Sequence, residues 1–182
     1  ASEIGFPVVM KIVSPEILHK TEIGGVLTGI ADAGAARQGY ETLMERARLA
    51  RPDARIDGVL VAQQIESGME CFMGINRDPV FGPIAVFGLG GIYVEVLKDI
   101  VLRPCPFGES EARQMIESIR AFPLLAGVRG QQGVDIDALA TMLSRLSRLA
   151  VGLGPDLLAI DVNPVIATPA GAWAADGVIE IE

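Results

Sequence analysis

The first residue whose type and position suggest chemistry is a lysine inside an apolar segment. Lys11 lies within the β-branched run of residues 7–13, which predicts a buried strand. A lysine is costly to bury there unless its ammonium group meets an anion. The alternative is that Lys11 points outward from a half-exposed strand. We therefore take Lys11 as a candidate phosphate ligand.

A glycine-containing loop follows this strand. Residues 14–25 are polar and end in Gly24-Gly25, which predicts a mobile loop. Glycines let backbone N–H groups approach phosphate oxygens closely, and Lys20 adds positive charge. The loop also carries His19, the only histidine in the sequence. A lone loop histidine is usually solvated and idle, but an imidazole beside a phosphate site can accept a phosphoryl group.

The third feature is a set of oxygen-bearing side chains near the C-terminal end. Asp161 and Asn163 are two residues apart in a predicted strand, so they share one face. Asp176 follows on the predicted partner strand, within pairing distance if residues 168–171 make the turn. Hard oxygen ligands of this kind suit Mg²⁺ carried by nucleotide phosphates. The alternative is that Asp161 and Asn163 only satisfy turn backbone near Pro164.

The elements that must position these residues follow from apolar periodicity and capping residues. Strands are predicted over residues 7–13, 26–30, 58–65, 69–76, 83–87, 93–102, 157–166 and 172–181. Helices are predicted after Asp32, with the apolar face Ala36, Tyr40, Leu43, Met44 and Ala47, over residues 109–119, and after Asp135. The strands fall in hairpin-like pairs with few helices between them. This pattern favours a mixed α+β fold over a doubly wound parallel sheet.

Composition restricts the function classes. The 182 residues are 50% hydrophobic and carry a formal net charge of −8, which fits one domain or two small lobes and argues against a large nucleic-acid interface. The longest uncharged stretch, residues 80–94, holds four glycines and a proline, so no membrane helix is predicted. Cys71 and Cys105 form no C-x-x-C pair, which indicates reduced thiols and a cytoplasmic location. Residues 1–5 look like the last turn of a helix, so we expect a truncated start.

Taken in order, the motifs of this chain closely resemble the ATP-grasp domain of NDP-forming acyl-CoA synthetases, which include ADP-forming acetate–CoA ligase. Succinyl-CoA synthetase β subunits are more distant relatives. The resemblance runs from Gly5 to about Glu180. It rests on Pro7-Val8-Val9-Met10-Lys11, residues 19–26, Gly68-Met69-Glu70, Asp78-Pro79-Val80-Phe81-Gly82-Pro83, Gly88-Leu89-Gly90-Gly91, Glu95 and Asp161-Val162-Asn163-Pro164.

The resemblance implies an α+β ATP-grasp fold, in which two lobes with mixed or antiparallel sheets surround a nucleotide cleft. Residues 1–65 would form the small lobe with the loop of His19 and Gly24-Gly25, and residues 66–182 the second lobe with the Mg²⁺-binding strands. The implied activity transfers a phosphoryl group between ATP or ADP and a histidine relay, in the interconversion of acyl-CoA and acyl phosphate. The cofactors implied are ATP/ADP and Mg²⁺.

The family's functional residues can be carried over one by one. His19 looks like the second histidine that relays phosphate between two sites. The residues that would bind nucleotide are Lys11, Lys20, Gly24, Gly25, Gln63, Gln64, Ile65 and Glu70, with residues 63–65 as the hinge that reads adenine and Glu70 near the ribose. The implied metal ligands are Asp161, Asn163 and Asp176. Ala62-Gln63-Gln64 stands where relatives often have Gln-Glu-Met or Gln-Pro-Met, which leaves the choice between ATP and GTP open.

The resemblance also implies partners. CoA-binding and CoA-ligase domains would come from the same polypeptide or from a partner subunit, in a homo- or hetero-oligomer, with no nucleic acid and no membrane. The rival hypothesis is a non-catalytic, ligase-like regulatory region of a protein lysine acetyltransferase.

Three further residues keep two interpretations each. Glu95 and Asp99 could face the cleft or only water. Arg129 matches a family motif or is a surface arginine.

Overall fold

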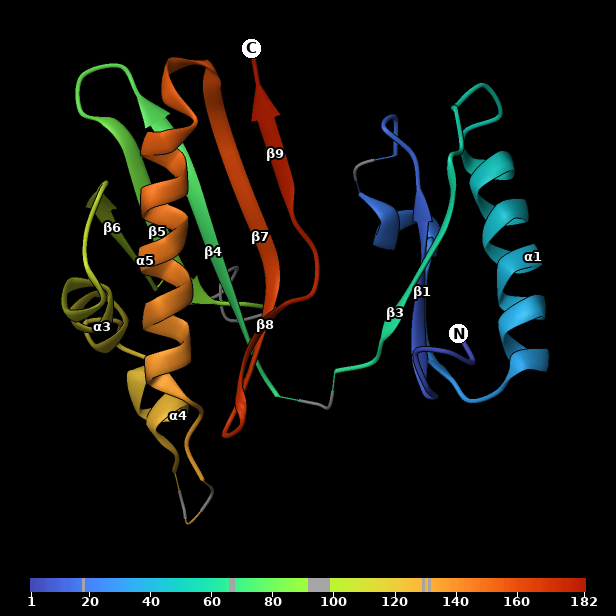
Figure 1. The fold of residues 1–182 in the computed structure, drawn as a ribbon, viewed down its shortest axis with the longest axis horizontal. Helices are drawn as coiled ribbons and strands as arrows, with labels where there is room; N and C mark the ends of the chain where they lie inside the picture. The colour runs from blue at the N-terminus through green and yellow to red at the C-terminus, as the bar shows by residue number, and fades with distance from the viewer. Residues whose placement is uncertain (18, 66–67, 92–98, 129, 131) are drawn as a thin grey trace. The chain divides into compact units, whose positions relative to one another are not determined.

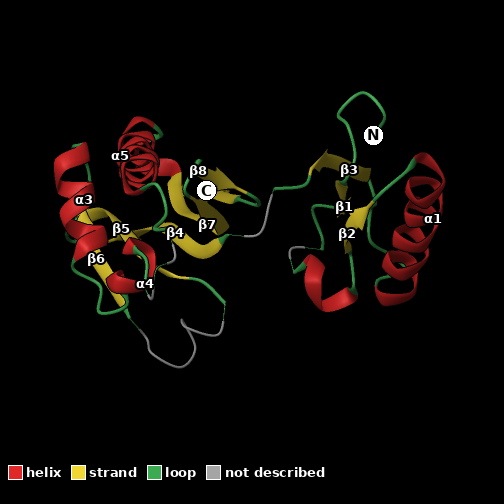
Figure 2. Ribbon diagram, turned by 90° about the horizontal axis from the view of Figure 1, so that it is seen from below, coloured by secondary structure: helices red, strands yellow, loops and turns green. Residues whose placement is uncertain are grey.

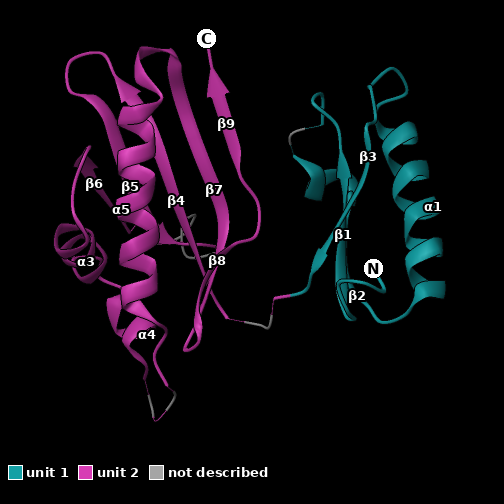
Figure 3. Ribbon diagram, in the orientation of Figure 1, with its two compact units in different colours: residues 1–64 teal, residues 65–182 magenta. Residues whose placement is uncertain are grey.

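The chain divides into two compact units. The computed structural model describes residues 1–182 apart from 18, 66–67, 92–98, 129 and 131. Unit 1 is Ala1–Gln64 and unit 2 is Ile65–Glu182 (Figure 3). The predicted lobes were residues 1–65 and 66–182, so the boundary differs by one residue. Within the described residues all strand pairings are antiparallel, and helices pack on the sheets. The expected α+β class is therefore confirmed.

Unit 1 is a three-stranded sheet with one long helix. β1 (Val8–Val13) lies between β2 (Val26–Ile30) and β3 (Gly58–Gln63), and α1 (Ala33–Ala50) packs beside the sheet (Figure 1). Alternate residues of β1 are buried, as the period of a half-covered strand requires. The core of this unit consists of Val8, Met10, Ile12, Ile17, Ile30, Leu43 and Ala47.

Helix α1 begins where the sequence predicts, and Leu43 and Ala47 of its predicted apolar face are buried in the core, whereas Tyr40 is not. The Asp32 side chain accepts a hydrogen bond from the Ala35 backbone nitrogen at 2.8 Å, which caps the first turn. Tyr40, predicted to be in the apolar face, is 47% exposed, whereas Gly39 is buried. A Cβ on Gly39 would lie 3.2 Å from the Met10 sulfur. The helix approaches the sheet closely at the residue that has no side chain.

Unit 2 is built on a larger antiparallel sheet. Its strand order is β6-β5-β4-β7-β8, and β9 also pairs with β7. The strands are β4 (Met69–Asp78), β5 (Gly82–Leu89), β6 (Ile100–Pro104), β7 (Leu157–Thr168), β8 (Gly171–Ala174) and β9 (Val178–Ile181). The helices are α3 (Glu109–Glu117), α4 (Phe122–Ala126) and α5 (Ile136–Gly152). Figure 2 shows α5 nearly end-on against the sheet, where Met73, Phe87, Met115 and Leu143 are fully buried.

Several predicted elements need correction. The single strand predicted over residues 172–181 is assigned as two strands, β8 and β9, which pair with β7 in the same register. The link between them still bonds to β7, since the Ala175 nitrogen donates to the Pro164 carbonyl and the Asp176 carbonyl accepts from the Asn163 nitrogen. Of the strand predicted over residues 93–102, the structure describes the part that belongs to β6, which begins at Ile100. Residues 93–98, including Glu95, lie outside the described residues, and so does Arg129. Helix α4 and the 3₁₀ turn η2 (Gly154–Asp156) escaped prediction because such short helices show no full apolar period.

Both cysteines are free thiols. Burial raises the pKa of Cys71 to about 12 and that of Cys105 to about 11, so both stay protonated and unreactive at neutral pH. Among the described residues, no helix combines the length and the apolar character needed to cross a membrane.

Candidate nucleotide site

Lys11 occupies the centre of the unit 1 sheet. Its Cα partners are Val26 on β2 and Leu60 on β3. The flanking residues Met10 and Ile12 are buried in the core beside α1, so Lys11 lies on the opposite, open face of the sheet and is half-buried. An apolar stem and a charged tip suit this position, since the methylenes can cover apolar neighbours while the ammonium reaches an anion.

The predicted loop after β1 contains a short 3₁₀ turn, η1 (Lys20–Ile23). Gly24 has φ = 63°, a left-handed conformation that favours glycine, and its nitrogen donates to the Thr21 carbonyl at 3.0 Å. The Gly25 nitrogen donates to the Lys20 carbonyl at 2.7 Å. The two glycine amides that were expected to face phosphate are thus hydrogen-bonded inside the loop in this conformation.

The size of Gly25 matters independently of its amide. A Cβ built on Gly25 would lie 2.8 Å from the Lys20 carbonyl oxygen and 2.9 Å from Ile12 Cγ2, so a side chain does not fit. The Ile12 nitrogen donates to the Gly25 carbonyl at 2.9 Å. These contacts hold the end of the loop beside Lys11, since Lys11 pairs with Val26. The lysine and the glycine loop predicted as a phosphate site are therefore brought together.

His19 lies at the start of η1 with an exposed side chain. Its carbonyl accepts a hydrogen bond from the Glu22 nitrogen at 3.2 Å, and its side chain makes no capping hydrogen bond to the turn. The backbone of His19 is thus fixed by the turn, while its imidazole projects into solvent. This is the arrangement that a phosphoryl acceptor needs, because the ring nitrogens stay accessible.

Sequence reasoning missed the residue that clamps this loop. Arg46 on α1 donates from Nη1 to the Gly24 carbonyl oxygen at 2.9 Å. The sequence carries no local signal for this contact, because the two residues are 22 positions apart and meet only when α1 packs on the sheet.

The predicted hinge lies at the end of unit 1. The Gln64 nitrogen donates to the Pro7 carbonyl at 3.2 Å, and the Gln64 side-chain oxygen accepts from the Gly29 nitrogen at 2.5 Å. Gln63 ends β3, is exposed and pairs with Val8. Ile65 is the first residue of unit 2. The side-chain oxygen and the backbone nitrogen of Gln64 are therefore both engaged within unit 1, so its carbonyl oxygen is the backbone group that could meet a base edge.

Glu70 lies on β4 beside the Gly88–Gly91 motif. The Gly90 nitrogen donates to the Glu70 carbonyl at 2.7 Å. A Cβ on Gly90 would lie 3.1 Å from Glu70 Cβ, and one on Gly91 would lie 3.4 Å from Glu70 Oε2. The glycines thus let the chain turn closely past an exposed carboxylate.

The predicted metal ligands gather on β7 and the segment before β9. Asp161 and Asn163 are both exposed on one face of β7. The Asn163 nitrogen donates to the Asp176 carbonyl at 3.2 Å, so Asp176 lies beside this face, in the link between β8 and β9 rather than on a strand as predicted. Burial and, secondly, the charge of Asp176 raise the pKa of Asp161 above its ordinary 3.8.

This donor set fits a hard divalent cation. Two carboxylates close enough to raise a pKa repel each other, and a cation between them would offset that repulsion. Among the described residues no group of three or more His, Cys, Asp and Glu side chains gathers to hold a metal. The third protein ligand at this place is the Asn163 amide, and Mg²⁺ commonly completes its shell with phosphate oxygens and water.

Two further features are not part of this site. Asp99, which could have faced the cleft, instead accepts hydrogen bonds from the Arg120 and Ala121 nitrogens at 3.0 and 2.7 Å and so anchors the start of α4.

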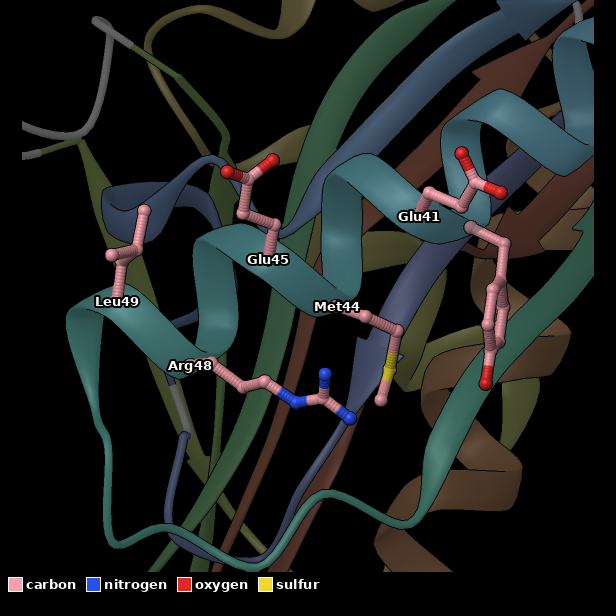
Figure 4. Close-up of a pocket in the computed structure, with 6 residues that line it drawn as sticks. Glu41, Met44, Glu45, Arg48 and Leu49 are labelled. Atoms are coloured by element: carbon pink, nitrogen blue, oxygen red, sulfur yellow. The ribbon is translucent and has the colours of Figure 1, made fainter.

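A hollow of about 430 Å³ lies on α1, where Figure 4 shows the Met44 and Arg48 side chains on one side of the helix. It contains none of the predicted site residues; its lining is Tyr40, Glu41, Met44, Glu45, Arg48 and Leu49.

Comparison with known proteins agrees with this geometry. The ATP-grasp domain family matches residues 1–181. The chain is 46% identical over 176 residues to the acetate–CoA ligase [ADP-forming] I subunit beta of Pyrococcus furiosus, covering 97% of this chain and 75% of that protein. It is 40% identical to acetate–CoA ligase [ADP-forming] I of Archaeoglobus fulgidus, covering 97% of this chain but 25% of that longer protein.

Solved structures show the same similarity. The acetyl-coenzyme A synthetase 1 of Ca. Korarchaeum cryptofilum, in complex with coenzyme A and Ca-AMPCP, superposes with a TM-score of 0.95 at 40% identity, covering 100% of this chain and 79% of that one. A second structure of that enzyme, with Mg-AMPPCP and a phosphohistidine segment pointing towards the nucleotide binding site, has a TM-score of 0.86 at 38% identity and covers the same shares. The chain therefore belongs to the ATP-grasp domain family, and it corresponds to the ATP-grasp part of the ADP-forming acid–thiol ligases.

Proposed function

We propose that this chain binds Mg²⁺ with ATP or ADP and exchanges a phosphoryl group with that nucleotide during acyl-CoA synthesis. The observation that carries the proposal is the backbone hydrogen bond that places Asp176 beside Asn163, with Asp161 on the same face of β7, because two carboxylates and an amide oxygen suit a hard cation. The family match supplies the nucleotide that would bring such a cation.

The predicted binding residues would each meet a different part of the nucleotide. Lys11 and Lys20 would offset phosphate charge, and the small Gly24-Gly25 segment would let the loop pass close to the phosphates. Gln63, the backbone of Gln64 and Ile65 would meet the adenine edge, whereas the Gln64 side chain stays on Gly29. Glu70, exposed beside Gly91, would accept hydrogen bonds from ribose hydroxyls.

Asp161, Asn163 and Asp176 would hold the metal. A bound Mg²⁺ supplies electrostatic neutralisation of the transferred phosphoryl group. The protein's own contribution is to keep three oxygen donors together, which the hydrogen bond from the Asn163 nitrogen to the Asp176 carbonyl does through the backbone.

His19 would be the phosphoryl carrier. In the ATP-forming direction the bond between phosphorus and the imidazole nitrogen breaks, and a terminal oxygen of ADP forms the new bond to phosphorus. The imidazole leaves with the electron pair of the broken bond and is then free to receive the next phosphoryl group. In the reverse direction the imidazole nitrogen attacks the terminal phosphorus of ATP, and ADP leaves. The exposed ring and the fixed backbone of His19 suit both directions.

The rest of the ligase would supply the CoA and acid chemistry. The relatives occur both as separate beta subunits and as longer single chains, of which this chain spans 75% and 25% respectively in the two cases compared. We propose that CoA-binding and CoA-ligase domains complete the enzyme, on the same polypeptide or on a partner subunit.

Substitution of His19 tests this function. We expect His19→Ala to lower thioester formation by the complete ligase at least about 10³-fold, because the acceptor atom is lost. The affinity for Mg·ADP, measured by calorimetry, should change less than about twofold, because binding rests on other residues. Leu49→Ala, at an exposed position on α1, is the matched control. Equal thioester formation by the His19→Ala and wild-type enzymes would disprove the relay.

A further inference from the structure

The turn between β4 and β5 displays two large apolar side chains to solvent. Val80 is 80% exposed and Phe81 is 69% exposed. Both belong to the Asp78–Pro83 motif, to which the proposed function gives no role. Glu70, on the same strand β4, is eight residues from Asp78, which is roughly 25 Å along an extended strand. The turn therefore lies at the end of unit 2 away from the proposed ribose contact.

This turn is held in one conformation. Asp78 Oδ1 accepts hydrogen bonds from both the Val80 and the Phe81 nitrogens, each at 2.8 Å. Gly82 closes the turn with φ = 73°, a left-handed conformation. Because the backbone is already ordered, Phe81 could enter a partner's pocket with little further loss of conformational entropy.

Other exposed apolar residues lie at the same end of unit 2 as this turn. Arg77 Nε donates to the Leu157 carbonyl at 2.6 Å, and Arg77 also donates to the Gly154 carbonyl, so the hairpin base joins the link between α5 and β7. The Glu182 nitrogen donates to the Asp156 carbonyl at 2.9 Å. Figure 1 shows this turn, this link and the C-terminus at one end of the unit. We use the name end patch for the exposed apolar residues at this end, Val80, Phe81, Leu153, Leu158 and Ile181.

The charges around the end patch are mainly acidic. Asp156, Glu180 and Glu182 are exposed here, against Arg148 near the end of α5. The whole chain carries a net charge of −8. A second copy of this chain would place acidic side chains against acidic side chains, so charge complementarity favours a basic partner.

We propose that the end patch docks the rest of the ligase, with Phe81 in an apolar pocket that basic residues surround. The inference rests on the proposed function. In acetate–CoA ligase [ADP-forming] I of Archaeoglobus fulgidus the region matched by this chain is 25% of the length, so a much larger remainder of that protein is available to cover such a patch. A rigid aromatic anchor inside a charged rim is the usual centre of such an interface, and a patch of this kind rarely stays bare on a solitary soluble protein.

Hydrogen–deuterium exchange tests the docking directly. We expect the amides of Val80, Phe81 and residues 178–182 to exchange at least tenfold more slowly in the complete ligase than in this chain alone. Phe81→Asp should abolish that difference, and Phe81→Ala should reduce it, in case the aspartate disturbs the turn. Leu49→Asp, at a position that is 75% exposed but lies on unit 1, should leave the difference unchanged.

The other outcomes also decide. Equal exchange in the complete ligase and in the chain alone would overturn the proposal, as would full protection in the Phe81→Asp ligase. Slower sedimentation of Phe81→Asp than of wild type, each measured alone, would assign the patch to a second copy and also overturn it. Calorimetry with Mg·ADP on the same samples separates the two proposals, because wild-type chain that docks but binds no nucleotide contradicts only the proposed function.

Discussion

The side-chain oxygen of Gln64 accepts a hydrogen bond from the backbone nitrogen of Gly29 at 2.5 Å. Gln64 is the last residue of unit 1, and Gly29 lies on β2, at the edge of the sheet opposite β3. Gly29 has φ = 70°, and the β1–β2 register shifts between Val8 and Met10, so this part of β2 is irregular. The contact ties the segment that leaves unit 1 to the far strand of its sheet.

Removal of this contact should loosen the proposed hinge. Gln64→Leu leaves the Gly29 amide without its side-chain acceptor, which costs about 1 kcal/mol. We expect a fivefold to tenfold weaker affinity for Mg·ADP, on the order of that energy, measured by calorimetry.

The conservative variant distinguishes the hydrogen bond from simple packing. Gln64→Glu keeps a side-chain oxygen acceptor, so it should retain near wild-type nucleotide affinity, whereas Gln64→Leu should not. If both variants lose affinity equally, the Gln64 amide rather than the contact with Gly29 serves the nucleotide.

The raised pKa of Asp161 predicts a pH dependence of stability. Because the folded-state pKa lies above the ordinary 3.8, the folded chain holds this proton more tightly than the unfolded chain. Asp161 therefore favours folding at pH below 3.8 and loses that contribution as the pH rises through its folded-state pKa. Asp161→Asn should raise the free energy of unfolding at pH 7 by less than about 1 kcal/mol, since water screens an exposed carboxylate.

The same variant should bind the metal–nucleotide complex less well, because a charged ligand has become neutral. Urea unfolding at pH 3 and pH 7 measures the first effect, and calorimetry with Mg·ADP measures the second. Asp156→Asn, an exposed acid in η2, is the control for both. A loss of stability at pH 7 in Asp161→Asn would contradict the assignment of Asp161 to a repelling pair.

A methyl group on Gly25 should distort the loop. It would approach the Lys20 carbonyl and Ile12 Cγ2 below 3.0 Å, so we expect Gly25→Ala to cost about 1–3 kcal/mol of unfolding free energy and to weaken nucleotide affinity. Gly152→Ala at the end of α5 has open space for its methyl and is the matched control. Equal stability of the two variants, measured by urea unfolding, would show that the loop yields to a side chain.

Asp99 should matter for folding and not for nucleotide binding. Asp99→Ala leaves the Arg120 and Ala121 nitrogens without their acceptor, which costs about 1–2 kcal/mol. Thermal unfolding measures the loss, and Asp53→Ala is the control at an exposed acid. A tenfold or larger drop in Mg·ADP affinity without loss of stability would place Asp99 in the nucleotide site instead.

The local elements were largely predictable, because their signals are short-range. The apolar alternation around Lys11 predicted β1, and the caps Asp32 and Asp135 predicted the first turns of α1 and α5, where each side chain accepts the expected backbone hydrogen bond. Tyr40 was wrongly assigned to the buried face, because apolar periodicity does not reveal that the helix packs against Met10 through Gly39.

Residue types and order alone determined the α+β class, the ATP-grasp family and a list of candidate ligands, because motifs and side-chain chemistry depend on residues that are close in sequence. Tertiary structure decided which of these groups meet. It placed Asp176 in the link between two strands beside Asn163. It also paired the Gln64 side-chain oxygen with the Gly29 nitrogen, and it hydrogen-bonded the Gly24 and Gly25 nitrogens to carbonyl groups within their own loop. Such contacts join residues many positions apart, so their partners depend on sheet register and helix packing rather than on neighbouring residues.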